Sequence, residues 1–164
     1  MPARAADLGC GDGRDTIELL RRGWEVIAID AEPLALERLA KRPDLPDGAK
    51  LTPLCGKFEE VDWAEVALVN ASFALPLCPP DAFPALWRKI TRLLKPGGRF
   101  AGQLYGERDS WAGDRAMTFF DEAGARGLFD AYAIEMFEIE ESDSVTPRGS
   151  AKHWHIFHIV AQRR

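Results

Sequence analysis

Three alternate glycines near the start of the chain are the residues whose spacing best suits chemistry. They lie in the segment Asp7-Leu8-Gly9-Cys10-Gly11-Asp12-Gly13, between a short apolar run and an amphipathic run that begins at Arg14. Glycines at such a junction let the backbone turn tightly and bring its N–H groups against a ligand at a helix N-terminus. A Gly-rich surface turn would look the same, but ligands of α/β sheets bind outside the carboxyl ends of the strands. The position therefore favours a ligand site.

Two familiar phosphate-binding loops fit these glycines poorly. The dinucleotide fingerprint G-x-G-x-x-G needs a small third residue, and the two possible registers place Arg14 or Thr16 there. A Walker-type loop ends in Gly-Lys-Ser or Gly-Lys-Thr, and neither sequence occurs after these glycines. A nicotinamide-binding oxidoreductase is therefore the weaker alternative.

The elements that must position this loop alternate between strand-like and helix-like runs, as in a parallel sheet covered by helices. The sequence predicts strands at residues 5–8, 24–30, 50–55, 65–72 and 99–105, and helices at about 14–22, 33–41, 83–94 and 109–129. Two more strand-like runs, 132–140 and 152–162, are joined by a polar loop. Because no helix separates them, we expect them to pair antiparallel. No linker or repeat interrupts the pattern, so residues 1–164 are predicted to form one domain.

Composition excludes several classes of protein. A formal net charge of −5, with Lys and Arg scattered among acids, argues against a nucleic-acid partner. No apolar run is long enough to span a membrane, and no secretion signal precedes the first strand, which favours a cytoplasmic protein. Cys10, Cys55 and Cys78 are widely spaced without a CxxC pair. They predict reduced thiols and no metal site.

The acid-x-G-x-G-x-G form resembles the first motif of the class I S-adenosylmethionine-dependent methyltransferases. Asp30, at the end of the second predicted strand, matches the acid that in this family bonds both ribose hydroxyls. Its alternative reading is an acid at the N-terminus of the helix that begins near Pro33. Residues 93–98, Leu-Leu-Lys-Pro-Gly-Gly, resemble the family's turn before strand five.

The resemblance implies a Rossmann-like α/β fold. Its sheet has seven mostly parallel strands and ends in a C-terminal antiparallel hairpin. Family members usually carry helices before the first strand, whereas this chain reaches that strand almost at Met1. We therefore expect the N-terminal helices to be missing. An upstream start, a shortened chain or a homodimer that supplies the cover would each account for this.

The resemblance also implies a set of residues that bind S-adenosylmethionine as the cofactor. They are Asp7, Gly9, Cys10, Gly11, Gly13, Asp30, Ala31, Phe58, Asn70 and Ala71. Residues 70–73 end the fourth strand, where the family places residues beside the methionine part and the acceptor. The chain departs from the family at Lys57, which replaces an acid that accepts a hydrogen bond from adenine. Phe58 can still pack on the base, and Glu59 or Glu60 is a candidate substitute for the acid.

The function implied is transfer of a methyl group from S-adenosylmethionine to a small-molecule acceptor by in-line displacement. Within the family the chain resembles small stand-alone bacterial enzymes, including tellurite- and thiopurine-detoxifying ones. The alternative is a non-catalytic cofactor-binding or scaffold module, which Lys57 and the missing helices suggest. Because positioning supplies most of the rate in such a displacement, about 7–11 kcal/mol, no catalytic residue can be assigned from the sequence.

Three histidines are the candidate bases, but they are more simply hydrogen-bonded strand residues: His153, His155 and His158. Tyr105 and Trp111 follow the fifth strand and are expected to contact the acceptor. Trp87 and Trp154 are expected to belong to the core.

Overall fold

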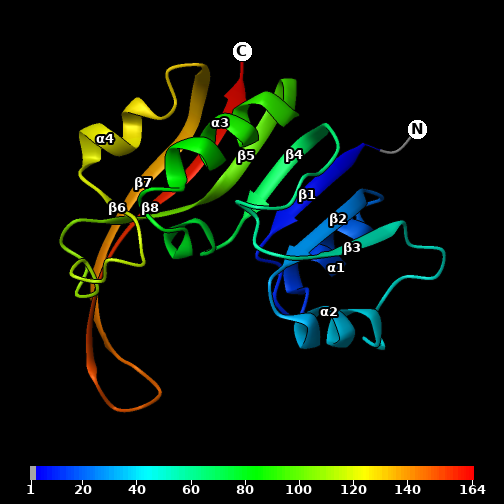
Figure 1. Cartoon of the computed structure of the whole chain (residues 1–164), viewed down its shortest axis with the longest axis horizontal. Helices are drawn as coiled ribbons and strands as arrows, with labels where there is room; N and C mark the ends of the chain where they lie inside the picture. Colours follow the sequence, from blue (N-terminus) through cyan, green and yellow to red (C-terminus); the bar gives the residue numbers. More distant parts are fainter. Residues whose placement is uncertain (1–2) are drawn as a thin grey trace.

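The computed structural model describes residues 3–164, which form one twisted sheet with helices on both faces (Figure 1). The strands are β1 (Arg4–Leu8), β2 (Glu25–Asp30), β3 (Leu51–Cys55), β4 (Val66–Ala71), β5 (Leu94–Gly106), β6 (Phe119–Phe120), β7 (Tyr132–Val145) and β8 (Ala151–Arg163). The helices are α1 (Arg14–Arg21), α2 (Pro33–Ala40), the 3-10 turn η1 (Leu75–Leu77), α3 (Phe83–Leu93) and α4 (Glu122–Gly127).

The strand order is β3-β2-β1-β4-β5-β8-β7, and the two-residue β6 pairs with β5. Strands β1 to β5 are parallel, whereas β8 is antiparallel to β5 and to β7. The predicted mostly parallel sheet with a C-terminal antiparallel hairpin is therefore confirmed. The order reverses between β1 and β4, and such a switch point opens a crevice at the carboxyl ends of the strands.

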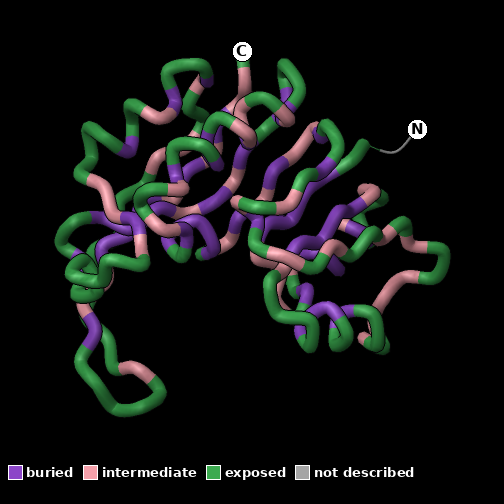
Figure 2. Tube along the Cα trace, viewed as in Figure 1, coloured by how far each residue is buried: buried purple, intermediate pink, exposed green. Residues whose placement is uncertain are grey.

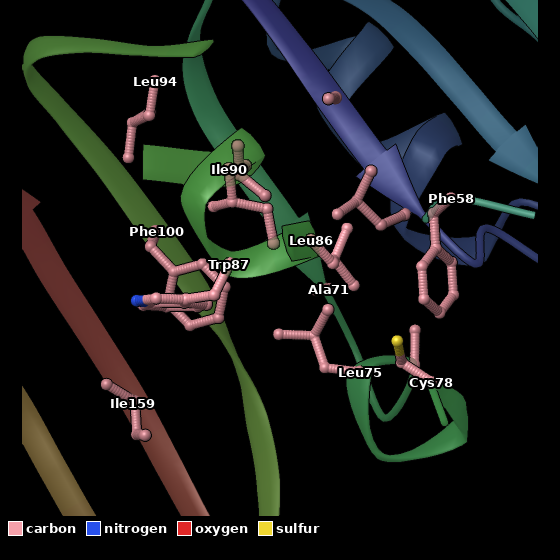
Figure 3. Close-up of a cluster of buried hydrophobic side chains, with 14 of the residues drawn as sticks. Phe58, Ala71, Leu75, Cys78, Leu86, Trp87, Ile90, Leu94, Phe100 and Ile159 are labelled. Atoms are coloured by element: carbon pink, nitrogen blue, oxygen red, sulfur yellow. The ribbon is translucent and has the colours of Figure 1, made fainter. Parts of the chain in front are cut away.

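Strand alternation divides the core between the two faces of the sheet. On β2, Val26 and Ala28 pack with the buried residues of α1 and α2, while Ile27 and Ile29 belong to the larger cluster on the other face. That cluster, drawn in Figure 3, contains Trp87 of α3 and Phe100 of β5. The purple segments of Figure 2 show that burial concentrates along the strands and leaves the tip of the β7–β8 hairpin exposed.

The local sequence explains how the first two helices begin. Gly13, in the left-handed conformation with φ 84°, precedes α1. Glu32 precedes α2, where its carboxylate accepts a hydrogen bond from Leu34 N, and Pro33 occupies the first turn. Proline suits that position because its fixed φ is helical and its missing N–H would have no partner there.

The predicted helix at 109–129 is wrong. Residues 107–117 form turns, β6 follows, and α4 spans only six residues. The start of this segment is not helical because the Asp109 side chain is buried, pairs with Lys152 and accepts a hydrogen bond from Trp111 N. Tertiary contacts here override the weak helical period.

Strands β5, β7 and β8 are longer than the sequence predicted. β5 begins at Leu94 rather than at residue 99, because Leu94 pairs with Val66 across a bulge and Gly97 turns with φ 78°. The β7–β8 ladder continues to the pair Val145–Ala151, so the connecting loop is shorter than expected. Among residues 3–164, no helix has the length and apolar character needed to cross a membrane.

Candidate functional site

The glycine loop between β1 and α1 borders a hollow of about 250 Å³. Its lining residues are Asp7, Gly9, Cys10, Asp12, Arg14, Asp15 and Ser72. Gly9, Gly11 and Gly13 all have positive φ, at 67°, 54° and 84°. A Cβ on Gly9 would lie 2.6 Å from Ala74 Cβ, and one on Gly13 would overlap the Leu39 side chain. The loop thus needs glycine for conformation and, at Gly9 and Gly13, also for space.

Acidic and amide side chains form a hydrogen-bonded group on the floor of this hollow. The buried Asp7 carboxylate accepts hydrogen bonds from Thr16 Oγ1 at 2.5 Å and from Asn70 Nδ2 at 2.9 Å. Asn70 Nδ2 also donates to Asp15 Oδ2 at 3.2 Å.

The two carboxyls differ in pKa. Burial raises the pKa of Asp7 despite these hydrogen bonds. Burial acts in the same direction on Asp15, but hydrogen bonds from Ser72, Asn70 and Arg14 outweigh it and lower that pKa. Asp15 therefore presents a carboxylate that suits a positively charged ligand group.

A second hollow of about 390 Å³ meets the first at Gly9. It is lined by Gly9, Asp30, Ala31, Lys57, Phe58, Glu59, Phe73, Ala74, Leu77, Pro79 and Ala116. Asp30 Oδ2 accepts a hydrogen bond from Gly11 N at 2.8 Å, and Oδ1 accepts one from Glu32 N at 2.9 Å. Because each carboxylate oxygen has two lone pairs, both oxygens retain a site for a further donor such as a hydroxyl.

The lining of the second hollow combines polar and apolar side chains. Phe58 is 9% exposed and belongs to the larger core cluster (Figure 3). Glu59 lines the hollow, whereas Glu60 does not line it and pairs with Lys57, 3.5 Å apart. Of the two candidate substitutes for the missing family acid, Glu59 is therefore the one that borders the hollow. A carboxylate and an aromatic ring in one hollow suit a nucleoside.

The structure brings nine of the ten predicted cofactor-binding residues around these hollows. Asp7, Gly9, Cys10, Asp30, Ala31 and Phe58 line them, while Gly11, Gly13 and Asn70 act through the contacts described above. Ala71 instead has a fully buried side chain in the core.

Sequence reasoning missed several lining residues. Asp12, Arg14, Asp15 and Ser72 lie in or beside segments that it did single out. Leu77, Pro79 and Ala116 come from connecting segments that carry no motif.

Cys10 contributes its backbone rather than a reactive thiol. Its N–H donates to Ile29 O at 3.0 Å, which ties the loop to β2. Burial, together with the carboxylates of Asp7 and Asp30, raises the pKa of the Cys10 thiol to about 12. At neutral pH the sulfur is therefore protonated and a weak nucleophile.

A third hollow of about 450 Å³ shares Phe73 with the second one. Its other lining residues are Tyr105, Glu140, Trp154 and Ile156. Tyr105 lines this hollow, whereas Trp111 does not line it and packs on Trp154 with ring centroids 5.3 Å apart; contact of these two residues with an acceptor stays a prediction. The expectation for Trp87 as a core residue is confirmed, whereas Trp154 is half-buried and lines this hollow.

The three histidines are hydrogen-bonded strand residues. His153 contacts Asp143 and Glu141, and His158 Nε2 lies 2.8 Å from Glu140 Oε2. The buried His155 contacts Arg108. The Arg108 backbone N–H donates a hydrogen bond to His155 Nδ1, and the two nitrogens lie 3.2 Å apart.

A further hollow, about 540 Å³, lies away from the glycine loop, beside β2 and β3. Its charged lining residues are paired, Glu25 with both Arg4 and Lys50, and Asp62 with Lys89. The hydrogen-bonding groups around Asp7 and Asp30 are the better candidate for a ligand site, because these two carboxylates are not paired with a lysine or an arginine in the described residues.

Comparisons with known proteins identify the family of the chain. Residues 5–98 match the family model described as "Methyltransferase domain". The chain is 33% identical over 98 residues to a carboxy-S-adenosyl-L-methionine synthase of Trichlorobacter lovleyi, a match that covers 56% of this chain and 40% of that protein. It is 34% identical over 100 residues to an uncharacterized methyltransferase of Synechocystis sp., covering 60% of this chain and 45% of the relative. The chain thus spans less than half the length of these curated relatives.

Solved structures share the fold. TehB from Haemophilus influenzae superposes with a TM-score of 0.86 at 12% identity, over 99% of this chain and 58% of that one. The 1,6-didemethyltoxoflavin-N1-methyltransferase of Burkholderia thailandensis, solved with S-adenosylhomocysteine, gives a TM-score of 0.69 at 24% identity, over 99% and 71%. These structures show the fold, and the family model, which covers more than half of the chain, identifies the family. The chain belongs to the methyltransferase domain family, in its class I, S-adenosylmethionine-dependent form.

Proposed function

We propose that residues 1–164 act as a single methyltransferase domain that binds S-adenosylmethionine across the first two hollows and methylates a small molecule. The observation that carries the proposal is the junction of those hollows at Gly9. It joins a pocket that contains the Asp30 carboxylate, whose free lone pairs suit a diol, to a pocket whose charged lining residues are Asp7, Asp12, Asp15 and Arg14. A nucleoside with a charged tail matches both parts.

The side chains present fit that cofactor. Both Asp30 oxygens keep lone pairs directed away from Gly11 N and Glu32 N, which suits the two ribose hydroxyls. Phe58 offers a face for the base, and Glu59 offers an acceptor for its amino group. The carboxylate of Asp15 favours positive charge in the other hollow.

S-adenosylmethionine, when bound, supplies a methyl group on a positively charged sulfur. The protein's contribution is to hold the reactants in line and to exclude water, which can supply about 7–11 kcal/mol of the barrier. The Gly9–Gly13 loop is tied to β2 through Cys10 N and Asp30, so its amides are fixed in place. Phe73, between the second and third hollows, marks where a methyl acceptor would approach.

The methylated compound is proposed to be a small molecule because the third hollow, next to the second one, has a volume of only about 450 Å³ and five lining residues. The methyltransferase from Burkholderia thailandensis, a structural neighbour, was solved with a small molecule, 1,6-didemethyltoxoflavin, bound. The homodimer, the absence of a nucleic-acid or membrane partner, and the cytoplasmic location stay predictions.

Titration calorimetry with S-adenosylhomocysteine tests the proposal. Asp30→Ala removes hydrogen bonds to a charged group, each worth about 1.5–3 kcal/mol, so affinity should fall at least tenfold. Gly11→Val places a β-branched residue at φ 54° and should also abolish binding.

The matched control is Asp47→Ala, which removes an exposed acid outside both hollows and should leave the affinity within twofold. Unchanged binding in both site variants would refute the assignment. Transfer of a radiolabelled methyl group to a panel of thiols, amines and hydroxyl compounds then tests the activity.

A further inference from the structure

The third hollow carries a more specific inference, which rests on the proposed function. Its lining residues come from three adjacent strands, β5, β8 and β7, and from the segment after β4. Tyr105 pairs in register with Ile156, which pairs in turn with Glu140. Residues in register share one face of a sheet. These three side chains therefore stand in a row, in a hollow that meets the second hollow at Phe73.

Most of the walls are aromatic or aliphatic. Tyr105 and Ile156 are buried, and the Tyr105 and Trp154 ring centroids lie 6.0 Å apart at 73°. Two rings at that angle present both a face and an edge to an occupant. Aromatic faces attract cations as well as apolar groups.

The polar group of the hollow is a carboxylate. Glu140 Oε2 lies 2.8 Å from His158 Nε2, and Oε1 accepts a hydrogen bond from Ser142 Oγ at 3.1 Å. The contact with His158, and then that with Ser142, lowers the pKa of Glu140. Glu140 thus stays ionised at neutral pH and retains free lone pairs.

Nearby positive charge is already neutralised. The Lys152 ammonium lies 4.0 Å from the centroid of the Trp154 ring, but its side chain is 1% exposed and pairs with the equally buried Asp109. Glu138, two residues before Glu140 on the same face of β7, adds a second acid to this side of the sheet. The electrostatic field at the hollow therefore favours a cation over an anion.

Phe73 lines both this hollow and the second hollow, and its backbone has a positive φ, which is uncommon for a residue other than glycine. Its φ is +52°, and its N–H donates to Gln103 Oε1 at 2.9 Å. A non-glycine residue in this region costs of order 1–3 kcal/mol and persists where surrounding contacts determine it. The Gln103 side chain also contacts His158, which in turn contacts Glu140, so one chain of contacts fixes both sides of the hollow.

We infer that the third hollow is the acceptor subsite and that it takes a small amine with an apolar or aromatic body. The ammonium group pairs with Glu140 and lies against the Tyr105 and Trp154 rings. The apolar body contacts Ile156 and Phe73. An acceptor that carries a carboxylate or phosphate at this end is repelled by Glu140.

The test compares three probes of one shape on the folded protein: phenethylamine, 2-phenylethanol and 3-phenylpropionate. Titration calorimetry, with and without S-adenosylhomocysteine, measures affinity. ¹⁵N NMR of the Trp154 indole, assigned with Trp154→Phe, reports where the probe lies. The amine should bind at least tenfold more tightly than the alcohol, and the acid should not bind.

Glu140→Gln should reduce the preference for amine over alcohol to less than threefold. Glu138→Gln is the matched control, since it removes the same charge from the same face but does not line the hollow. It should retain most of the preference.

Equal binding of amine and alcohol, or equal effects of the two variants, would overturn the inference. Because probe binding is measured without the nucleoside as well, loss of S-adenosylhomocysteine binding alone would instead count against the proposed function.

Discussion

Replacing Gly13 and Gly11 separately by alanine tests the account of the glycine loop. Both residues have positive φ, at 84° and 54°, so alanine at either position costs about 1–2 kcal/mol in backbone strain. The two positions differ in the space that is available for a Cβ atom. A Cβ on Gly13 would overlap Leu39, a fully buried residue of the α1–α2 core, whereas a Cβ on Gly11 meets no atom within 4 Å.

The space difference sets the size of the expected effect. Overpacking a close-packed core costs about 1–3 kcal/mol, so Gly13→Ala should destabilise by about 2–5 kcal/mol in total. Gly11→Ala should cost only the strain. The entropy lost from the unfolded chain is the same in both variants and cancels in the comparison.

Urea denaturation followed by circular dichroism measures this difference. With a slope of about 2 kcal/mol/M, the two midpoints should differ by about 0.5–1.5 M. Equal midpoints would show that Leu39 moves aside without cost, and the argument that Gly13 is required for space would fail. A larger loss in Gly11→Ala would contradict the argument outright.

Two further predictions concern the β8 strand. Lys152→Met should destabilise by about 3–5 kcal/mol because it leaves Asp109 charged and buried, and adding Asp109→Asn should recover at least half, as measured by urea unfolding. In an NMR titration, His153 should titrate above the usual value near 6.5, since Asp143 and then Glu141 raise its pKa, and His155 below it, since burial and then Arg108 lower its pKa. His153 therefore stabilises the hairpin below about pH 6.5, and this contribution disappears as pH rises through its folded pKa. The reverse titration order would contradict these contacts.

Much of the fold follows from sequence because its signals are local. The apolar run before Asp30 predicts a buried parallel strand, and the glycine after Arg22 predicts the end of the first helix. The antiparallel hairpin follows from the lack of a crossover helix between two strand-like runs. Each of these depends on residues within a few positions of one another.

The segment from Asp109 to Phe129 shows where local signals fail. Its apolar spacing suits a helix, but the partner that decides its structure, Lys152, lies 43 residues away. Burial of an ion pair depends on which strands become neighbours, and a sequence window does not contain that information. The early start of β5 at Leu94 has the same origin, since its partner Val66 belongs to another strand.

The candidate site shows the same difference between local sequence signals and contacts made by distant residues. Most of the residues predicted to bind the cofactor lie together because one continuous loop and one strand end supply them, as Gly9 and Asp30 illustrate. The third hollow was anticipated only in part, at Tyr105 and at residues 70–73, because its other polar and aromatic residues, Glu140 and Trp154, come from strands far along the chain. No motif connects them, and only the register of β5, β8 and β7 brings them together.

The two kinds of site also differ in what holds them. The glycine loop is tied to β2 by the backbone hydrogen bond from Cys10 N to Ile29 O and by the Asp30 carboxylate, which accepts a hydrogen bond from Gly11 N. The third hollow is made of side chains on a sheet face, where substitution changes shape and charge without disturbing the strand ladder. Substitutions in the third hollow should therefore change what it binds without changing the glycine loop. Phe73 lines both the second and the third hollow, so its replacement should affect both.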